Sequence, residues 1–254
     1  MSLCTTSSLP VGVLALALVA GCASTAPRVD APATAAARAV CPGGSARGDQ
    51  ELAGLVGCRR IEGDLVVSGV SSLSPLASLE AVSGTLAVRG STAESLGGLE
   101  RLRSVEGLAL EQNQKLDDIS ALESLDSAKR LSFVGNPRLS RPTGLSRLSE
   151  LEQLVVRDTA FLSLHGLEGL TRIDSLQIQN NPKLISLGAL NEVRFSREVV
   201  LEGNPIVCAS FGVLTGLSVP PLQLVARSNS SLRSADLRHL LRAPKAERDG
   251  IALR

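Results

Sequence analysis

A short apolar triplet recurs along the middle of the chain, with one residue of any kind between two apolar residues. The seven copies begin at Leu65, Leu86, Leu108, Leu131, Leu154, Leu176 and Val199. Successive copies are 21, 22, 23, 23, 22 and 23 residues apart. So regular a period is typical of a solenoid, in which each turn of the chain buries one face against its neighbours.

Each triplet predicts one β-strand, with its first and third side chains in the interior and its middle one outside. After the strand, apolar residues follow at every third position, as in Leu73, Leu76, Leu79 and Val82. This spacing fits neither a long helix nor a flat strand, and it favours short extended or 3₁₀ pieces. The sequence therefore predicts a mainly β fold, a parallel β-solenoid with one strand in each turn.

An asparagine stands five positions after the strand start in four of the turns, at Asn113, Asn136, Asn181 and Asn204. A turn inside a solenoid leaves backbone N–H and C=O groups without strand partners, and an amide side chain can satisfy both kinds. We therefore expect these asparagines to be structural rather than ligand-binding. The other three turns carry Val70, Ser91 and Thr159 at this position.

The combined pattern, Leu-x-Leu-x-x-Asn-x-x-Leu-x-x-Leu with a glycine just upstream, resembles the receptor L-domain of insulin and epidermal growth factor receptors. It is also similar to leucine-rich repeats, but those place a leucine two residues after the asparagine. Here Leu116, Leu139 and Leu184 stand three residues after it. The resemblance covers about residues 41–208, includes the flanking cysteines, and implies a right-handed solenoid.

The first 22 residues are typical of an export signal. The apolar run at residues 9–20 is shorter than the roughly 20 residues that a membrane-spanning helix needs. Ala20 and Gly21 followed by Cys22 resemble the lipobox of bacterial lipoproteins, where the signal is cut before the cysteine and lipid is attached to its sulfur. The resemblance implies a lipid anchor at Cys22, and Ala23 in place of aspartate implies the outer membrane.

Four segments follow from these observations: a signal peptide at 1–21, a flexible tether at 22–40, the repeat domain at 41–219, and a C-terminal cap and tail at 220–254. The tether is rich in alanine and proline and has no large apolar residue except valine, so nothing there offsets the entropy of ordering. Residues 234–242 predict a short amphipathic helix that covers the last turn. A helix on the membrane surface is the alternative.

Two cysteines, Cys41 and Cys58, stand at the start of the repeats with sixteen residues between them. In an exported chain this predicts a disulfide that closes the open end of the stack. A zinc site is the alternative, but His165 and His239 lie far away in the sequence. We expect Cys208 to be a buried small residue in the last turn, with exchange into the disulfide left open.

Charge and motifs narrow the function. The chain has 26 basic and 25 acidic residues and no basic run, which argues against a nucleic-acid partner. It carries no motif of a nucleophile, P-loop, dinucleotide site or metalloprotease, and no turn has the aspartate cluster of calcium-dependent lyases. We therefore expect no catalytic residues, no cofactor and no metal.

The outward strand positions are where a partner would bind. They mix charges and amides, and the sequence has neither Trp nor Tyr, the residues most frequent at tight protein interfaces. The candidate residues are Arg89, Glu111, Arg130, Gln153, Arg157, Gln177 and Gln179. The favoured hypothesis is a recognition surface for protein or glycan. The alternatives are a structural envelope lipoprotein without a specific ligand and, third, an enzyme that acts on polysaccharide.

Overall fold

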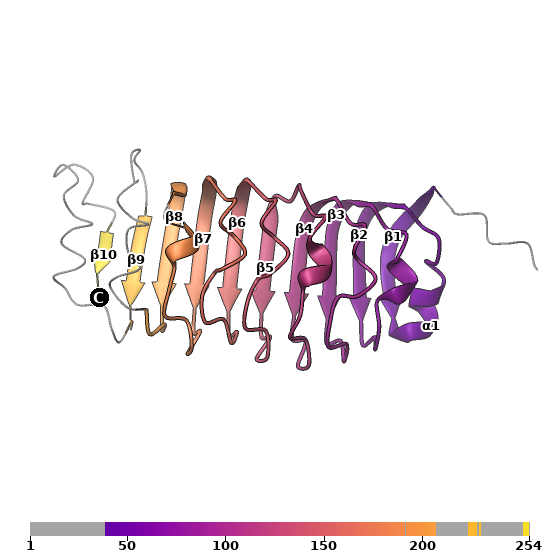
Figure 1. The fold of residues 1–254 in the computed structure, drawn as a ribbon, viewed down its shortest axis with the longest axis horizontal. Helices are drawn as coiled ribbons and strands as arrows, with labels where there is room; N and C mark the ends of the chain where they lie inside the picture. The colour runs from indigo at the N-terminus through magenta and orange to yellow at the C-terminus, as the bar shows by residue number, and fades with distance from the viewer. Residues whose placement is uncertain (1–38, 191, 207–222, 228, 230–250, 254) are drawn as a thin grey trace, which may run out of the picture. The chain divides into compact units, whose positions relative to one another are not determined.

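The computed structural model describes residues 39–190, 192–206, 223–227, 229 and 251–253. In these residues one sheet of ten parallel strands runs in chain order, and each strand pairs with the next (Figure 1). The strands are β1 (Val40–Arg47), β2 (Arg60–Ser68), β3 (Ala81–Arg89), β4 (Ser104–Glu111), β5 (Arg130–Val134), β6 (Glu150–Arg157), β7 (Arg172–Gln179), β8 (Arg194–Glu202), β9 (Gln223–Arg227) and β10 (Ile251–Leu253). The mainly β, parallel solenoid with one strand per turn is confirmed.

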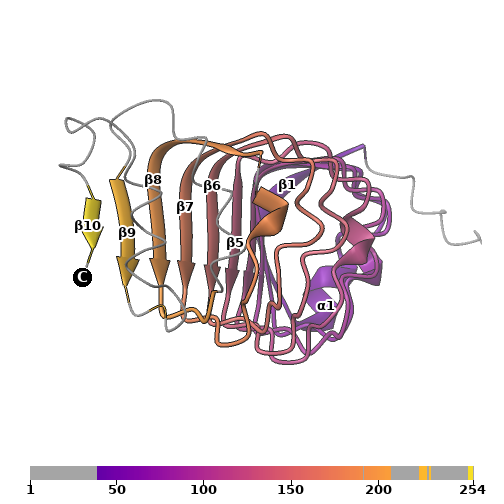
Figure 2. The same ribbon diagram turned by 60° about the vertical axis from the view of Figure 1, so that its left-hand side comes forward.

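Helical structure in the described residues is short. One α-helix, α1, spans Gly48–Ala53, and three 3₁₀ turns span Ser74–Leu76 (η1), Ser120–Leu122 (η2) and Gly188–Leu190 (η3). Figure 2 shows the strands together along one side of the turns, with the loops and short helices along the other. The 3₁₀ turns lie in the segments where apolar residues recur at every third position, because each such step returns one side chain to the interior.

The core is a stack of aliphatic columns. Leu86 pairs in register with Leu65 on one side and with Leu108 on the other, and all three are at most 2% exposed. The same column continues through the later triplets to Val199. Burial of apolar surface against the neighbouring turns is the main favourable term of folding. The predicted alternation therefore holds for the first and third residues of each triplet.

The asparagines form a ladder along the interior. Asn181 is fully buried, its Nδ2 donates to the Val156 carbonyl at 3.1 Å, and its Oδ1 accepts from the Thr159 backbone N–H at 3.0 Å. The other three asparagines make the same donation to the strand carbonyl one turn earlier, from Asn113 to Val88, from Asn136 to Leu110 and from Asn204 to Ile178. Each amide thus joins two turns and satisfies backbone groups that have no strand partner.

The ladder extends one step beyond the predicted set. Asn229 stands five residues after Leu224, its Nδ2 donates to the Leu201 carbonyl at 2.9 Å, and its Oδ1 accepts from the Asn204 N–H at 3.1 Å. In a turn without asparagine, the Ser91 hydroxyl donates to the Val70 carbonyl at 2.9 Å. A hydroxyl can thus replace part of the amide's role.

The residue before the ladder position has a left-handed backbone in all seven predicted turns. Four of these residues are glycines, and the others are Gln112, Asp158 and Asn180, with φ between 53° and 55°. A positive φ is unfavourable for any residue with a Cβ, which accounts for the glycines. The sequence signal was a glycine four positions after the strand start, as in Gly69 and Gly90.

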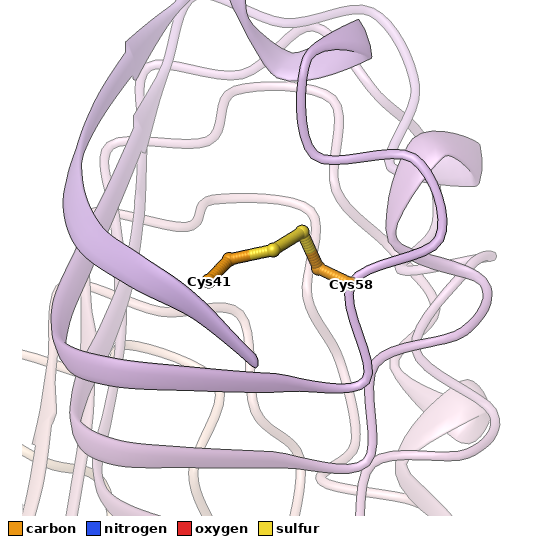
Figure 3. The surroundings of a disulfide bond; sticks show 2 residues. All are labelled: Cys41 and Cys58. Atoms are coloured by element: carbon orange, nitrogen blue, oxygen red, sulfur yellow. A yellow bond between two sulfur atoms is a disulfide. The ribbon is translucent and has the colours of Figure 1, made fainter. Parts of the chain in front are cut away.

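A disulfide staples the N-terminal end of the sheet. Cys41 on β1 and Cys58 after α1 are bonded, and both are at most 3% exposed (Figure 3). The helix α1 buries Leu52 against the core, and the Asp49 carboxylate accepts from the backbone N–H and the hydroxyl of Ser71 at 2.7 and 2.6 Å. These bonds lower the pKa of Asp49. The predicted disulfide is confirmed.

The strand ladder is longer at both ends than the seven triplets predicted. β1 pairs with β2 although it has only two buried apolar side chains, Cys41 and Ala46, and no triplet. β9 and β10 lie beyond Pro221, where the sequence pattern predicts only a cap and tail. As the first strand of the sheet, β1 pairs with a neighbour on one side only, so fewer of its residues need to be apolar.

Several predictions concern residues outside those described: the signal peptide at 1–21, nearly all of the tether at 22–40, the lipid anchor at Cys22, the buried Cys208 and the helix at 234–242. Within the described ranges, no helix is both long and apolar enough to cross a membrane.

Candidate binding face

The seven candidate residues share one face of the sheet, and strand register arranges them in three columns. Arg89, Glu111, Arg157 and Gln179 belong to the column just after the triplets, which Val134 on β5 interrupts. Arg130 and Gln153 are paired in the column just before the triplets. Gln177 lies in the middle column. The structure therefore brings all seven together across β3–β7.

Most of the charges on this face are already paired. Arg89 Nε lies 2.9 Å from Glu111 Oε2. Further along, Arg157 Nη2 donates to Gln179 Oε1 at 2.5 Å, and Gln179 Nε2 donates to Glu202 Oε2 at 3.0 Å. Pairs at this exposure contribute little to stability, about 0–1 kcal/mol each, but they hold the side chains side by side in a defined order. A ligand would therefore meet a preformed row of guanidinium, amide and carboxylate groups.

The middle column is smooth and mostly apolar. It runs through Val66, Ala87, Ala109, Ser132, Val155, Gln177 and Val200. Ala87 and Ala109 are only 2% and 9% exposed although they point away from the core, because their side chains are too short to rise above the neighbouring columns. This is the one respect in which the predicted alternation fails, and the small size of alanine is the reason.

A groove opens beside this face, between the segment just before β5 and the first residues of β6 and β7. It has a volume of about 380 Å³, and its charged lining comes from Asp126, Lys129, Glu150, Glu152, Arg172 and Asp174. Lys129, Glu152 and Asp174 directly precede Arg130, Gln153 and Ser175 of the face. The groove and the face are therefore continuous around the corner of the solenoid.

Two local features create the groove. Strand pairing between β5 and β6 begins only at Arg130 and Gln153, so the segments before them are not joined as a ladder. In addition, Ala128 stands at the buried corner position that Val105 and Leu151 occupy in the adjacent turns. A methyl group in place of a larger side chain leaves space at the surface.

One carboxylate of the groove is buried. The Asp174 residue is 7% exposed, and its Oδ1 accepts from the Ser196 hydroxyl at 2.5 Å and from Arg172 Nε at 3.0 Å. The Ser196 hydrogen bond is the main cause that lowers the pKa of Asp174, with the positive charges of Arg172 and Arg197 adding to it against the opposing effect of burial. Asp174 is thus ionised, and its carboxylate is already bound to Ser196 and Arg172.

The free acceptors of the groove are Asp126 and Glu150, whose carboxylates have no hydrogen bond or ion pair with any described residue. Sequence reasoning missed the groove. The available signal was Ala128, a small residue in a column of larger aliphatic side chains, together with the absence of glycine before the fourth triplet.

The described residues contain no group of three or more His, Cys, Asp or Glu side chains placed to hold a metal ion. His165 is exposed on a loop and pairs with Glu168 three residues later, away from the strand face.

Comparison with known proteins yields no family model that matches the chain and no curated protein similar to it.

Proposed function

We propose that the chain is a non-catalytic lipoprotein of the cell envelope, anchored through Cys22, and that its solenoid is a recognition module whose strand face binds a protein or a glycan. The observation that carries the proposal is the continuous surface formed by the three outward-facing columns of β3–β7 and the adjoining groove. A regular sheet holds such side chains at fixed spacings, so little conformational entropy is lost when a ligand binds.

The chemistry of the surface suits recognition. Its polar groups are paired with one another rather than arranged as a nucleophile, a general base and an orienting group. The receptor L-domain resemblance points the same way. The outer membrane remains the proposed location, on the strength of Cys22 and Ala23.

The recognition proposal is tested with full-length protein and the double variant Arg130→Glu/Arg157→Glu. Both arginines are partly exposed on the face, and reversal of their charge leaves the core columns intact. We expect affinity capture from envelope extracts to retain a defined ligand on the wild-type protein and to lose it on the double variant. Lys183→Glu, an exposed charge reversal on a loop, is the control. Equal capture by all three proteins contradicts a ligand site on this face and favours the structural alternative.

The anchor is tested separately. Metabolic labelling with a palmitate analogue should mark the wild-type protein and leave Cys22→Ser unlabelled. Label that persists without Cys22 contradicts the lipobox assignment and leaves the recognition proposal untouched.

A further inference from the structure

We propose that the groove beside Ala128 binds a pyranose ring of a glycan that carries hydroxyl groups and no carboxylate or sulfate. The inference rests on the proposed recognition function, which leaves protein and glycan open, and it selects the glycan and locates its principal contact.

The dimensions of the groove fit a small polar ligand. Its volume of about 380 Å³ lies near the lower end of the roughly 300–1,000 Å³ of small-molecule sites. It is open to solvent and continuous with the face of β5–β7. One sugar ring can therefore enter while the rest of the chain leaves over the columns that carry Gln153 and Gln177.

The lining matches the hydrogen-bonding character of a sugar. A hydroxyl group donates one hydrogen bond and accepts others, so it can use carboxylates and cations at once. The carboxylates of Asp126 and Glu150 lack partners among the described residues and are free to accept from ligand hydroxyls. Lys129 lies on the same groove as a donor, with only a long contact of 3.6 Å to Glu106. Hydrogen bonds to charged groups are roughly twice as strong as neutral ones.

The charge of the lining argues against acidic ligands. Four carboxylates and two cations line the groove, and one cation, Arg172, is already bound to the buried Asp174. A uronate or sulfate would face a net negative surface and would be repelled. Ala128 and Leu151 also line the groove, but they are only 6% and 3% exposed, so hydrogen bonds rather than apolar contacts would hold the ring.

A protein partner fits the groove less well, because proteins fill small pockets mainly with large side chains such as Trp, Tyr or Arg, which pack closely and exclude water. The groove has little apolar lining to hold such an anchor. The serious competitor is a basic side chain of a peptide, which the free carboxylates would also attract, and the experiment includes it as an outcome.

The test uses the full-length chain and isothermal titration with cellohexaose, maltohexaose and mannohexaose, with hexagalacturonate and hexalysine as charged probes. We expect at least one neutral hexasaccharide to bind and hexagalacturonate not to bind. Ala128→Leu enlarges a residue that lines the groove and should weaken binding at least tenfold. Glu150→Gln removes a free charged acceptor and should weaken it about tenfold.

Glu123→Gln is the matched control, because Glu123 is an exposed carboxylate outside the groove and should leave the affinity unchanged. If Ala128→Leu lowers the melting temperature, the exposed Glu150→Gln decides the result alone. Binding of hexalysine alone, binding of no hexasaccharide, or equal affinity of wild type and Glu150→Gln overturns the inference. If capture that depends on Arg130 and Arg157 persists in that case, the recognition function stands without the groove; if it is also absent, both proposals fail.

Discussion

The turns that carry β2, β3 and β4 have glycine at the bend before the triplet, whereas those that carry β5, β6 and β7 have Lys129, Glu152 and Asp174 near it. At Gly84 the turns approach so closely that an added Cβ would lie 2.3 Å from Asp64 Oδ1 and 2.7 Å from the Gly63 carbonyl carbon. In the later turns polar side chains stand at the bend, and the groove opens there.

This difference shows that different residues determine the packing of the core and the shape of the surface at the bend before each triplet. The same leucine columns run through both halves of the sheet, so the interior does not determine where the surface is hollow. The residues at the bend determine where it is hollow. Glycine gives a closed, closely stacked corner in the first half, and larger residues with a missing stretch of ladder give an open one in the second.

The interior also differs in one respect. The third residue of the triplet is Val88 on β3 but Phe133 on β5, where its ring packs edge-to-face on Phe161 with centroids 5.6 Å apart. Phe133→Ala should lower the free energy of unfolding by about 4 kcal/mol, because it leaves a large cavity. Val88→Ala, at the equivalent position, should cost about 2 kcal/mol.

Urea denaturation followed by circular dichroism measures both changes, with the outward-facing Ser132→Ala as a control that should stay within about 0.5 kcal/mol of wild type. Equal losses for Phe133→Ala and Val88→Ala would remove the contrast between the two interiors.

Removal of the disulfide tests whether the N-terminal strands need this bond for their stability. The double variant Cys41→Ser/Cys58→Ser should lose about 3 kcal/mol, because the sequence separation of 17 closes a short loop in the unfolded chain. Since turns of a solenoid contact only their neighbours, hydrogen exchange should accelerate in β1 and α1 and remain slow in β6 and β7. Acceleration spread evenly over the whole sheet would contradict this local role.

Much of this fold was predictable because the regular period of the triplets implies one strand in each turn of a solenoid. Leu65, Leu86 and Leu108 recur at the strand spacing, so their alignment follows from the sequence. The groove was not predictable from the same pattern. It depends on Ala128 being smaller than residues that are adjacent only in space, and on a loss of pairing that the triplets do not encode.

For the candidate face, too, one part was predictable from the sequence and another was not. Strand alternation correctly placed the residues on one surface, since successive side chains point to opposite sides. The pairing of Arg157 with Gln179 depends on the conformations of long side chains on separate strands, which no local pattern specifies.

Gly84→Ala tests the closed corner. The added methyl group would overlap the backbone of Gly63 and the carboxylate of Asp64, whose Oδ1 also accepts from the Thr85 N–H at 2.6 Å. We expect a loss of about 2 kcal/mol in the free energy of unfolding. Gly97→Ala is the control, because its nearest neighbour, Ser95 Oγ, would lie at an ordinary 3.4 Å. A loss no larger than that of the control would mean that the corner is not closely packed.

Asp174→Asn tests the open corner through pH. The folded-state pKa of Asp174 lies below its ordinary value of 3.8, so its ionised form stabilises the fold above that value and the contribution disappears as the pH falls through the folded pKa. The variant should be about 1.5 kcal/mol less stable at neutral pH, and the difference should shrink below about pH 4. Thermal unfolding from neutral to acidic pH measures it, with the unpaired Asp126→Asn as control. A difference that does not vary with pH would assign the effect to packing.

The smallest effect concerns the backbone just after the triplets. The first two predicted turns have Gly69 and Gly90 at the left-handed position, whereas the third has Gln112 with a φ of 55°. Gln112→Gly should raise the free energy of unfolding by about 0.5 kcal/mol, because relief of the unfavourable φ exceeds the added entropy of the unfolded chain. Gly90→Ala, the reverse change in the first half, should lower it by about 1 kcal/mol. If Gln112→Gly instead destabilises the protein, the glutamine side chain must contribute more than its backbone conformation costs, and the requirement for glycine would belong to the first half alone.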